Sequence, residues 1–210
     1  MTGMTMLTAA DRQRVEAAIR SVEAKTSGEL VMVIAGRADP YFFVSLLYAT
    51  GGAFTLPPIL WMLGLSHDVA VLYAVQVGGF LGLFALLRWT PLLMLLVPDS
   101  VKQARAARLA RDQFMARGLA DTPERGGVLL FAAAAERYVE VIADKGIHAR
   151  VPDDAWITVI ARFSEPVRAG RTAEGFLAAI ETAGEFLMRH MPAPAGNPNR
   201  LSDVLVEIRG

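Results

Sequence analysis

Two β-rich runs lie close together in the second half of the chain. Residues 128–134 are apolar without interruption, which is the pattern of a strand buried on both faces. Residues 138–143 alternate between the two faces of a second strand. Only a polar break at residues 135–137 separates the runs, and residues 144–146 end the second run as a turn. The pattern therefore predicts an antiparallel hairpin at the centre of a sheet.

Helical periodicity and a further strand surround this hairpin. An apolar stripe predicts a first helix over residues 9–25, which Gly28 ends in the left-handed conformation, and residues 29–35 then form a strand. Pro166 is expected to kink or end the helix that starts at Pro152. The other predicted elements are a helix over residues 101–117, which Gly118 ends, a last helix to about residue 191, and residues 201–208 as a short edge strand or an extended docked tail.

A long uncharged stretch interrupts this α/β pattern. No charged residue occurs from Pro40 to Ser66, so residues 42–65 are long enough to cross a hydrocarbon core of about 30 Å as a helix. A second uncharged run covers residues 69–87, after a short polar turn. Two such runs in succession favour a transmembrane helical hairpin over two buried core helices of a larger soluble fold. Residues 91–97 are apolar again, and they either extend the second helix or lie at the membrane interface.

Both ends of such a hairpin emerge on the same side of the membrane, so the segments that flank it can join in one folded body. We expect residues 8–37 and 100–191 to form a discontinuous α/β domain and residues 41–97 to form the transmembrane hairpin. Residues 192–210 begin with a proline-rich stretch and are expected to be a linker and a C-terminal tail. The predicted fold class is α/β, a small mixed-sheet sandwich interrupted by a two-helix transmembrane hairpin.

Basic residues flank the uncharged hairpin and are absent from its turn. The basic residues that follow the second run can bind anionic lipid headgroups, where each contributes about 1 kcal/mol of binding free energy. The alternative interpretation is that they form an ordinary solvated helix face. Basic residues close to span ends are retained in the cytoplasm. We therefore expect a multi-pass protein of the bacterial inner membrane, with both termini and the α/β body cytoplasmic, and the N-terminus shows no secretory signal. The predicted membrane-surface residues are Arg88, Trp89, Lys102, Arg105, Arg108 and Arg111.

Composition excludes several classes of function. The formal net charge is zero, which gives no indication of a nucleic-acid partner. The chain has no cysteine, which removes disulfides, thiol catalysis and thiolate zinc sites. The histidines, at positions 67, 148 and 190, are too far apart in sequence to suggest a pair of metal ligands. We expect no cofactor, and the expected partners are the lipid bilayer, its anionic headgroups and another membrane protein.

A set of short motifs runs through the predicted α/β body, at residues 26–29, 125–131, 135–137, 139–141 and 143–147, with Trp156 and the link at residues 168–171. Together they resemble the TPM domain, and within that family the bacterial membrane proteins with a transmembrane hairpin inserted after the first strand. The resemblance implies a compact α/β sandwich with helices on both faces of a small mixed sheet. Some relatives are described as phosphatases or calcium binders, and others as assembly or maintenance factors for membrane complexes.

Polar residues around the β hairpin are the candidates for a functional site. A calcium ion takes about six to eight oxygen ligands, and the chain has no Asp-x-Asp-x-Asp-Gly loop. We therefore expect no metal site, and Glu136, Glu140 and Asp144 are the candidate ligands if one exists. The candidate catalytic residues are Glu136, Arg137, Asp144 and His148, which would have to converge in one pocket.

Two functions are compatible with these observations. The preferred hypothesis is a membrane-tethered, non-catalytic interaction or assembly module at the cytoplasmic face of the membrane. The alternative is a phosphoester hydrolase, possibly dependent on a cation. Convergence of the four catalytic candidates on a cleft would favour the hydrolase, and a flat face with these side chains spread into solvent would favour the module.

Overall fold

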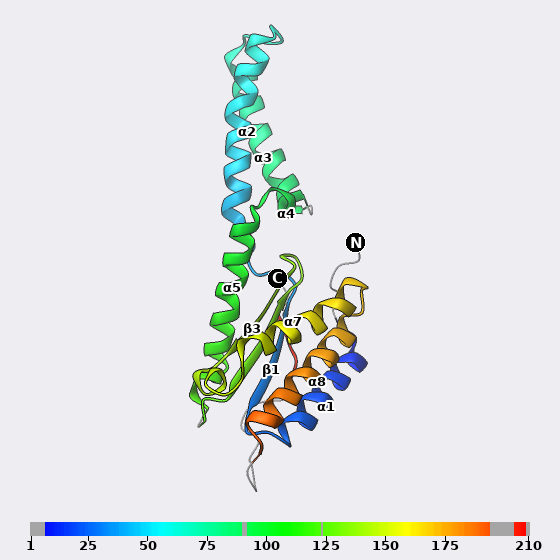
Figure 1. Ribbon diagram of the computed structural model, residues 1–210. Coiled ribbons are helices and arrows are strands. Elements are labelled where there is room, and N and C mark those ends of the chain that lie inside the picture. The colour runs from blue at the N-terminus through cyan, green and yellow to red at the C-terminus, as the bar shows by residue number, and fades with distance from the viewer. Residues whose placement is uncertain (1–6, 90–91, 123, 194–203, 209–210) are drawn as a thin grey trace. The chain divides into compact units, whose positions relative to one another are not determined.

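The chain divides into two compact units. The computed structural model describes residues 7–89, 92–122, 124–193 and 204–208. The units separate between Ala38 and Asp39 and again between Lys102 and Gln103. The outer segments together form an α/β body, and the segment between them forms a helical hairpin (Figure 1).

In the described part of the chain, four strands form the sheet of the α/β body, in the order β3-β2-β1-β4. β1 (Glu29–Ala35) pairs in parallel with β2 (Gly127–Ala133) along its whole length. β1 also pairs in parallel with β4 (Val206–Ile208) over its last three residues, so the edge-strand alternative for the C-terminal segment is confirmed. Of the predicted linker and C-terminal tail at residues 192–210, residues 194–203 and 209–210 lie outside the described residues.

β2 pairs antiparallel with β3 (Tyr138–Ala143), which confirms the predicted hairpin. Its predicted place at the centre of the sheet is wrong, because β3 has only β2 as a neighbour among the described strands and forms an edge. Every residue of both β1 and β2 is buried, whereas most of β3 is only partly buried. Burial on both faces therefore marks the two central strands, which are far apart in the sequence.

Three helices cover one face of the sheet (Figure 1). α1 (Ala9–Glu23) packs against α8 (Thr172–His190), which also packs against α7 (Asp153–Arg168). The rings of Phe163 and Phe176 join α7 and α8 edge to face, with centroids 5.0 Å apart. Each large side chain buried in this way stabilises the fold by about 1.5–3 kcal/mol. Fully buried members of this core include Ile19, Met32, Leu130, Phe163, Phe176 and Ile180.

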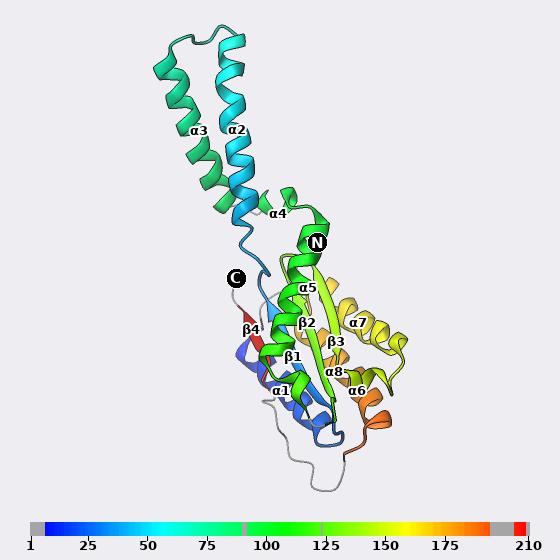
Figure 2. The same ribbon diagram turned by 90° about the vertical axis from the view of Figure 1, so that its left-hand side faces the viewer.

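α5 (Asp99–Ala116) covers the opposite face of the sheet (Figure 2). It buries Ala106, Ala110 and Phe114, which recur every four residues and form one stripe along the helix. Gly118 follows with a φ of 70°, and the predicted stop of this helix is confirmed.

One local prediction at the loops is wrong. α1 ends at Glu23, and Gly28 is not left-handed; a Cβ on Gly28 would lie 3.1 Å from a methyl group of Leu187, so close packing explains the glycine instead. Residues 144–146 do end β3, as predicted, and they lead directly into one turn of helix. Asp144 caps a short helix, α6 (Lys145–His148), by accepting a 2.8 Å hydrogen bond from the backbone N–H of Lys145.

The second unit is built on two long antiparallel helices, α2 (Phe42–Met62) and α3 (Val69–Trp89) (Figure 2). Both are long and apolar enough to cross a membrane. A short helix, α4 (Leu92–Leu96), contacts both of them, and Leu93 and Tyr41 are buried together there. Residues 90 and 91, which precede α4, lie outside the described residues.

Candidate functional site

Three loops of the α/β body meet at the end of the sheet where β1 and β2 begin and β3 ends. The Ser27 hydroxyl donates a 3.0 Å hydrogen bond to Glu124 Oε2, and Arg150 Nη1 lies 3.5 Å from the same oxygen. Arg125 Nη1 lies 3.7 Å from Asp144 Oδ2. These five residues are called the loop cluster below.

The charges of the loop cluster are balanced within it. Arg125 and Arg150 each face a carboxylate, and the side chains of Arg125, Arg150 and Glu124 are each about half exposed. Water therefore screens the Arg150–Glu124 pair, which contributes about 0–1 kcal/mol. The Arg125–Asp144 pair differs, because the side chain of Asp144 is buried. Each cation of the loop cluster has an anion beside it, so the formal charges of the four ionised side chains cancel. The geometry of the loop cluster indicates a junction that holds three loops together.

Glycines allow the backbones of these loops to approach closely. A Cβ on Gly127 would overlap the carbonyl group of Leu119, and a Cβ on Gly146 would overlap the carbonyl oxygen of Glu124. The backbone N–H of Gly126 donates a 2.8 Å hydrogen bond to the Thr122 hydroxyl. The family motifs at residues 26–29, 125–131 and 143–147 therefore meet at one place, and close backbone packing is a physical reason for their small residues.

The turn between β2 and β3 lies at the opposite end of the hairpin. Glu136 is 8% exposed, and its Oε1 accepts a 3.0 Å hydrogen bond from the backbone N–H of Ala38, which ties the turn to the segment after β1. Arg137 is exposed and adopts a φ of 53°. The Tyr138 hydroxyl donates a 2.8 Å hydrogen bond to Glu140 Oε2. Burial raises the pKa of Tyr138 above its ordinary value, and the hydrogen bond to the Glu140 carboxylate is a second, smaller cause of the increase.

The candidate catalytic residues fall into two separate groups. Glu136 and Arg137 precede β3, whereas Asp144 and His148 follow it, and a strand of six residues is about 20 Å long. The structure therefore does not bring the four together in one pocket. Glu140, the remaining candidate metal ligand, lies between the two groups on β3. Among the described residues, no three His, Asp or Glu side chains are grouped so that they could hold a metal ion.

The predicted membrane-surface residues differ in their surroundings. Arg88 donates a 3.1 Å hydrogen bond to the carbonyl oxygen of Pro40, and its guanidinium lies 5.9 Å from the ring centroid of Phe42. Lys102 is largely covered and pairs with Asp99 over 2.9 Å. The side chain of Trp89 lies outside the described part of the structure. The exposed members on α5 are Arg105, Arg108 and Arg111.

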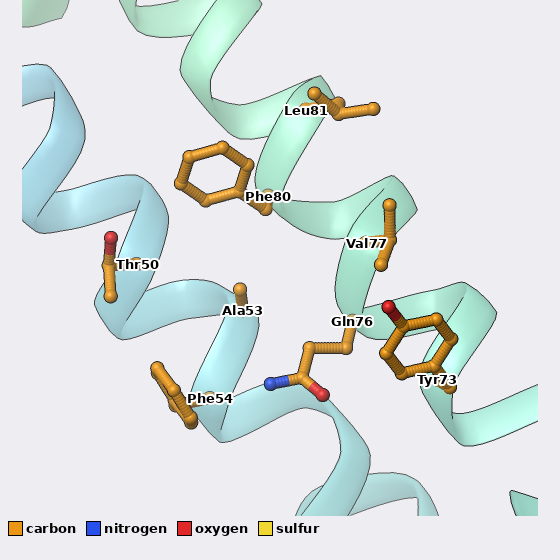
Figure 3. A pocket seen from close by; sticks show the side chains of 8 residues that line it. All are labelled: Thr50, Ala53, Phe54, Tyr73, Gln76, Val77, Phe80 and Leu81. Carbon is orange, nitrogen blue, oxygen red and sulfur yellow. The ribbon is translucent and has the colours of Figure 1, made fainter.

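A hollow of about 370 Å³ lies between the two helices of the hairpin (Figure 3). Gln76 projects from α3 toward α2 in this hollow. Its side chain is the only amide in the two uncharged runs, and this was the signal in the sequence that could have identified it. The contact of Ser27 with Glu124 was not predicted, because the spacing of residues in the sequence gives no signal for it. Residues that line the hollow include Ala53, Phe54, Tyr73, Gln76, Val77 and Phe80.

Residues 90–186 match the family model of the TPM domain. The TPM resemblance is thereby confirmed. The BA42 protein from the psychrophilic bacterium Bizionia argentinensis, whose structure was determined by NMR, is similar in fold, with a TM-score of 0.60. The two are 18% identical, over 97% of this chain and 96% of that one, so the likeness shows the TPM-type fold alone. The comparison with curated proteins finds no match.

Proposed function

We propose that this TPM-domain protein is anchored in the bacterial inner membrane by α2 and α3, and that its α/β body is a non-catalytic interaction module at the cytoplasmic face. The exposure of the hairpin carries this proposal. In the most apolar stretch of 18 residues in each helix, 17% of the residues are buried in α2 and none are buried in α3. Soluble proteins rarely expose apolar patches beyond a few hundred Å², and a bilayer would cover this surface.

Charges at the ends of the hairpin support the orientation. Arg37 precedes α2 and Arg88 ends α3, whereas the turn between the helices contains His67 and Asp68 but no lysine or arginine. The basic residues are therefore on the side of the α/β body, which favours a cytoplasmic body. On α5, Arg108 is 72% exposed, with only a 4.0 Å contact to Asp112, and is available to anionic lipid headgroups or to an acidic partner surface.

The positions of the catalytic candidates support a module over a phosphoester hydrolase. A hydrolase needs a nucleophile or activated water and its proton acceptor within hydrogen-bond reach of one substrate atom. Here the two groups of candidates are separated by the length of β3. The loop cluster does place Ser27 beside a carboxylate, but Arg150 lies 3.5 Å from the same Glu124 oxygen, so that oxygen is shared between the hydroxyl and a cation.

Reporter fusions after Gly210 test the membrane anchor and its orientation together. We expect a fluorescent-protein fusion to be bright in the membrane fraction and an alkaline phosphatase fusion to be inactive, because the C-terminus is cytoplasmic. Replacement of Arg88, Lys102, Arg105 and Arg108 by glutamine, with two lysines added to the turn, is a control that should invert the signals. Active phosphatase with a dark fluorescent fusion in the unmodified chain would contradict the proposed orientation.

Hydrolysis of p-nitrophenyl phosphate by the purified protein tests the non-catalytic role. We expect no turnover above the buffer, with or without millimolar calcium or magnesium. Measurable turnover that is lost in a folded Ser27→Ala or Asp144→Asn variant would contradict the non-catalytic role. It would favour the phosphoester hydrolase instead.

A further inference from the structure

We propose that the hollow between α2 and α3 is the docking site of a second copy of this chain, joined by reciprocal hydrogen bonds between the two Gln76 side chains. The inference rests on the proposed membrane insertion of the hairpin. It identifies this chain itself as one partner of the membrane module.

Gln76 lies within the hydrocarbon region if α3 spans the bilayer. It follows Val69, the first residue of α3, by seven positions, which places it about 10 Å along the helix. Within the described residues its amide makes no hydrogen bond, although it points toward α2. A polar group without a partner in hydrocarbon is costly, because lipid tails offer neither donors nor acceptors.

A second copy supplies the missing partner at the required depth. Two identical hairpins insert to the same depth, so Gln76 of one copy meets Gln76 of the other. The amide has both a carbonyl acceptor and N–H donors, so a two-fold pair can exchange two hydrogen bonds. Hydrogen bonds between polar side chains are known to stabilise the association of transmembrane helices. Lipid tails would fill the hollow but would leave the amide unpaired.

The glycines of the hairpin distinguish the face of α3 that packs against α2 from the opposite face of the same helix. Gly52 and Gly79 are already used in the contact between α2 and α3, because a Cβ on either would lie 2.6 Å from a leucine methyl group of the other helix. Gly78 and Gly82 lie on the other side of α3, where a Cβ would meet nothing within 4 Å. Substitutions at Gly78 therefore provide a matched control at the same depth.

Disulfide cross-linking of the full-length chain in membranes tests the proposal. The chain has no cysteine, so each single substitution introduces the only thiol. Val77 lines the hollow and Gly78 does not. We expect Val77→Cys to form a disulfide-linked dimer on oxidation and Gly78→Cys to remain monomeric. Adding Gln76→Leu to Val77→Cys should reduce the dimer yield by about threefold or more, because the shared amide contact is lost.

The other outcomes each overturn the proposal. A dimer from Gly78→Cys with none from Val77→Cys would assign the contact to the glycine face. A Val77→Cys dimer that Gln76→Leu leaves unchanged would show that the amide does not hold the copies together. Alkaline carbonate extraction distinguishes failure of the docking from failure of the membrane anchor. A chain that stays in the membrane but does not dimerise contradicts only the docking. A chain that is extracted contradicts the proposed membrane anchor as well.

Discussion

Tyr138 lies at the start of β3, partly buried, with its hydroxyl on Glu140. Burial and the carboxylate raise the pKa of this phenol in the folded protein, whereas an unfolded chain has the ordinary value of about 10. The folded state therefore binds the phenolic proton more tightly than the unfolded state. This contribution to stability is complete below about pH 10 and is lost as the pH rises toward the folded-state value.

This linkage predicts a difference in alkaline stability between the wild type and Tyr138→Phe. As the pH rises from about 9 to 11, the free energy of unfolding should fall more steeply in the wild type, because only it has this phenol to ionise. Urea unfolding at several pH values measures both slopes. The three other tyrosines, at positions 41, 48 and 73, are common to both proteins and cancel in the comparison. Equal slopes would show that the surroundings of Tyr138 do not perturb its ionisation.

At the scale of elements, the short strand β4 depends on contacts made by its side chains. Leu205, just before β4, is buried in the core with α1 and α8. The side chain of Glu207 is 8% exposed, and its Oε2 lies 2.7 Å from Arg12 Nη2 on α1. Three residues of pairing with β1 are a small ladder, so this ion pair, which is buried only on the Glu207 side, is an important attachment of the strand.

We predict that Arg12→Ala destabilises the α/β body by about 1–3 kcal/mol, because it leaves the Glu207 carboxylate buried without its cation. Arg14→Ala is the matched control on the same helix. Arg14 lies 3.5 Å from Asp11 in an exposed pair, so its loss should change the free energy of unfolding by less than about 0.5 kcal/mol. Thermal or urea unfolding measures both variants, and equal effects would mean that the pair to Glu207 does not stabilise β4.

At the scale of the whole molecule, the hairpin is inserted between two segments that complete one sheet. β1 precedes the hairpin and β2 follows it, yet they pair over seven residues. Tyr41 and Val97, at the two ends of the insertion, belong to one buried cluster. A short connection is therefore sufficient to close the chain when the hairpin is removed.

Replacement of residues 42–97 by a short glycine-serine linker should give a soluble protein that unfolds cooperatively, because the sheet and both of its helical layers remain. A fragment that starts at Asp99 is the control; it lacks α1 and β1 and should aggregate, since β2 and β4 lose the strand between them. Solubility, circular dichroism and urea unfolding distinguish the two. Aggregation of the linked protein at every linker length, or independent folding of the fragment, would contradict a discontinuous α/β domain.

Local patterns in the sequence determined most elements of this protein. Apolar periodicity located β1, β2, β3 and the helices α1, α5, α7 and α8, and the uncharged runs located α2 and α3. These signals are local because a helix or strand buries its face according to the spacing of its own residues. Gly118 was likewise identified as a helix stop, because its left-handed backbone is a local requirement.

Only the tertiary structure decided which strands are neighbours and which polar side chains meet. Backbone hydrogen bonds between strands do not depend on residue identity, so the sequence did not reveal that β1 lies between β2 and β4 or that β3 is an edge. For the same reason, Glu136 and Asp144 appeared to share a site but lie at opposite ends of β3, while Ser27 and Glu124, 97 positions apart, form a hydrogen bond. Contacts between distant segments are set by the packing of the whole chain, which no short window of sequence contains.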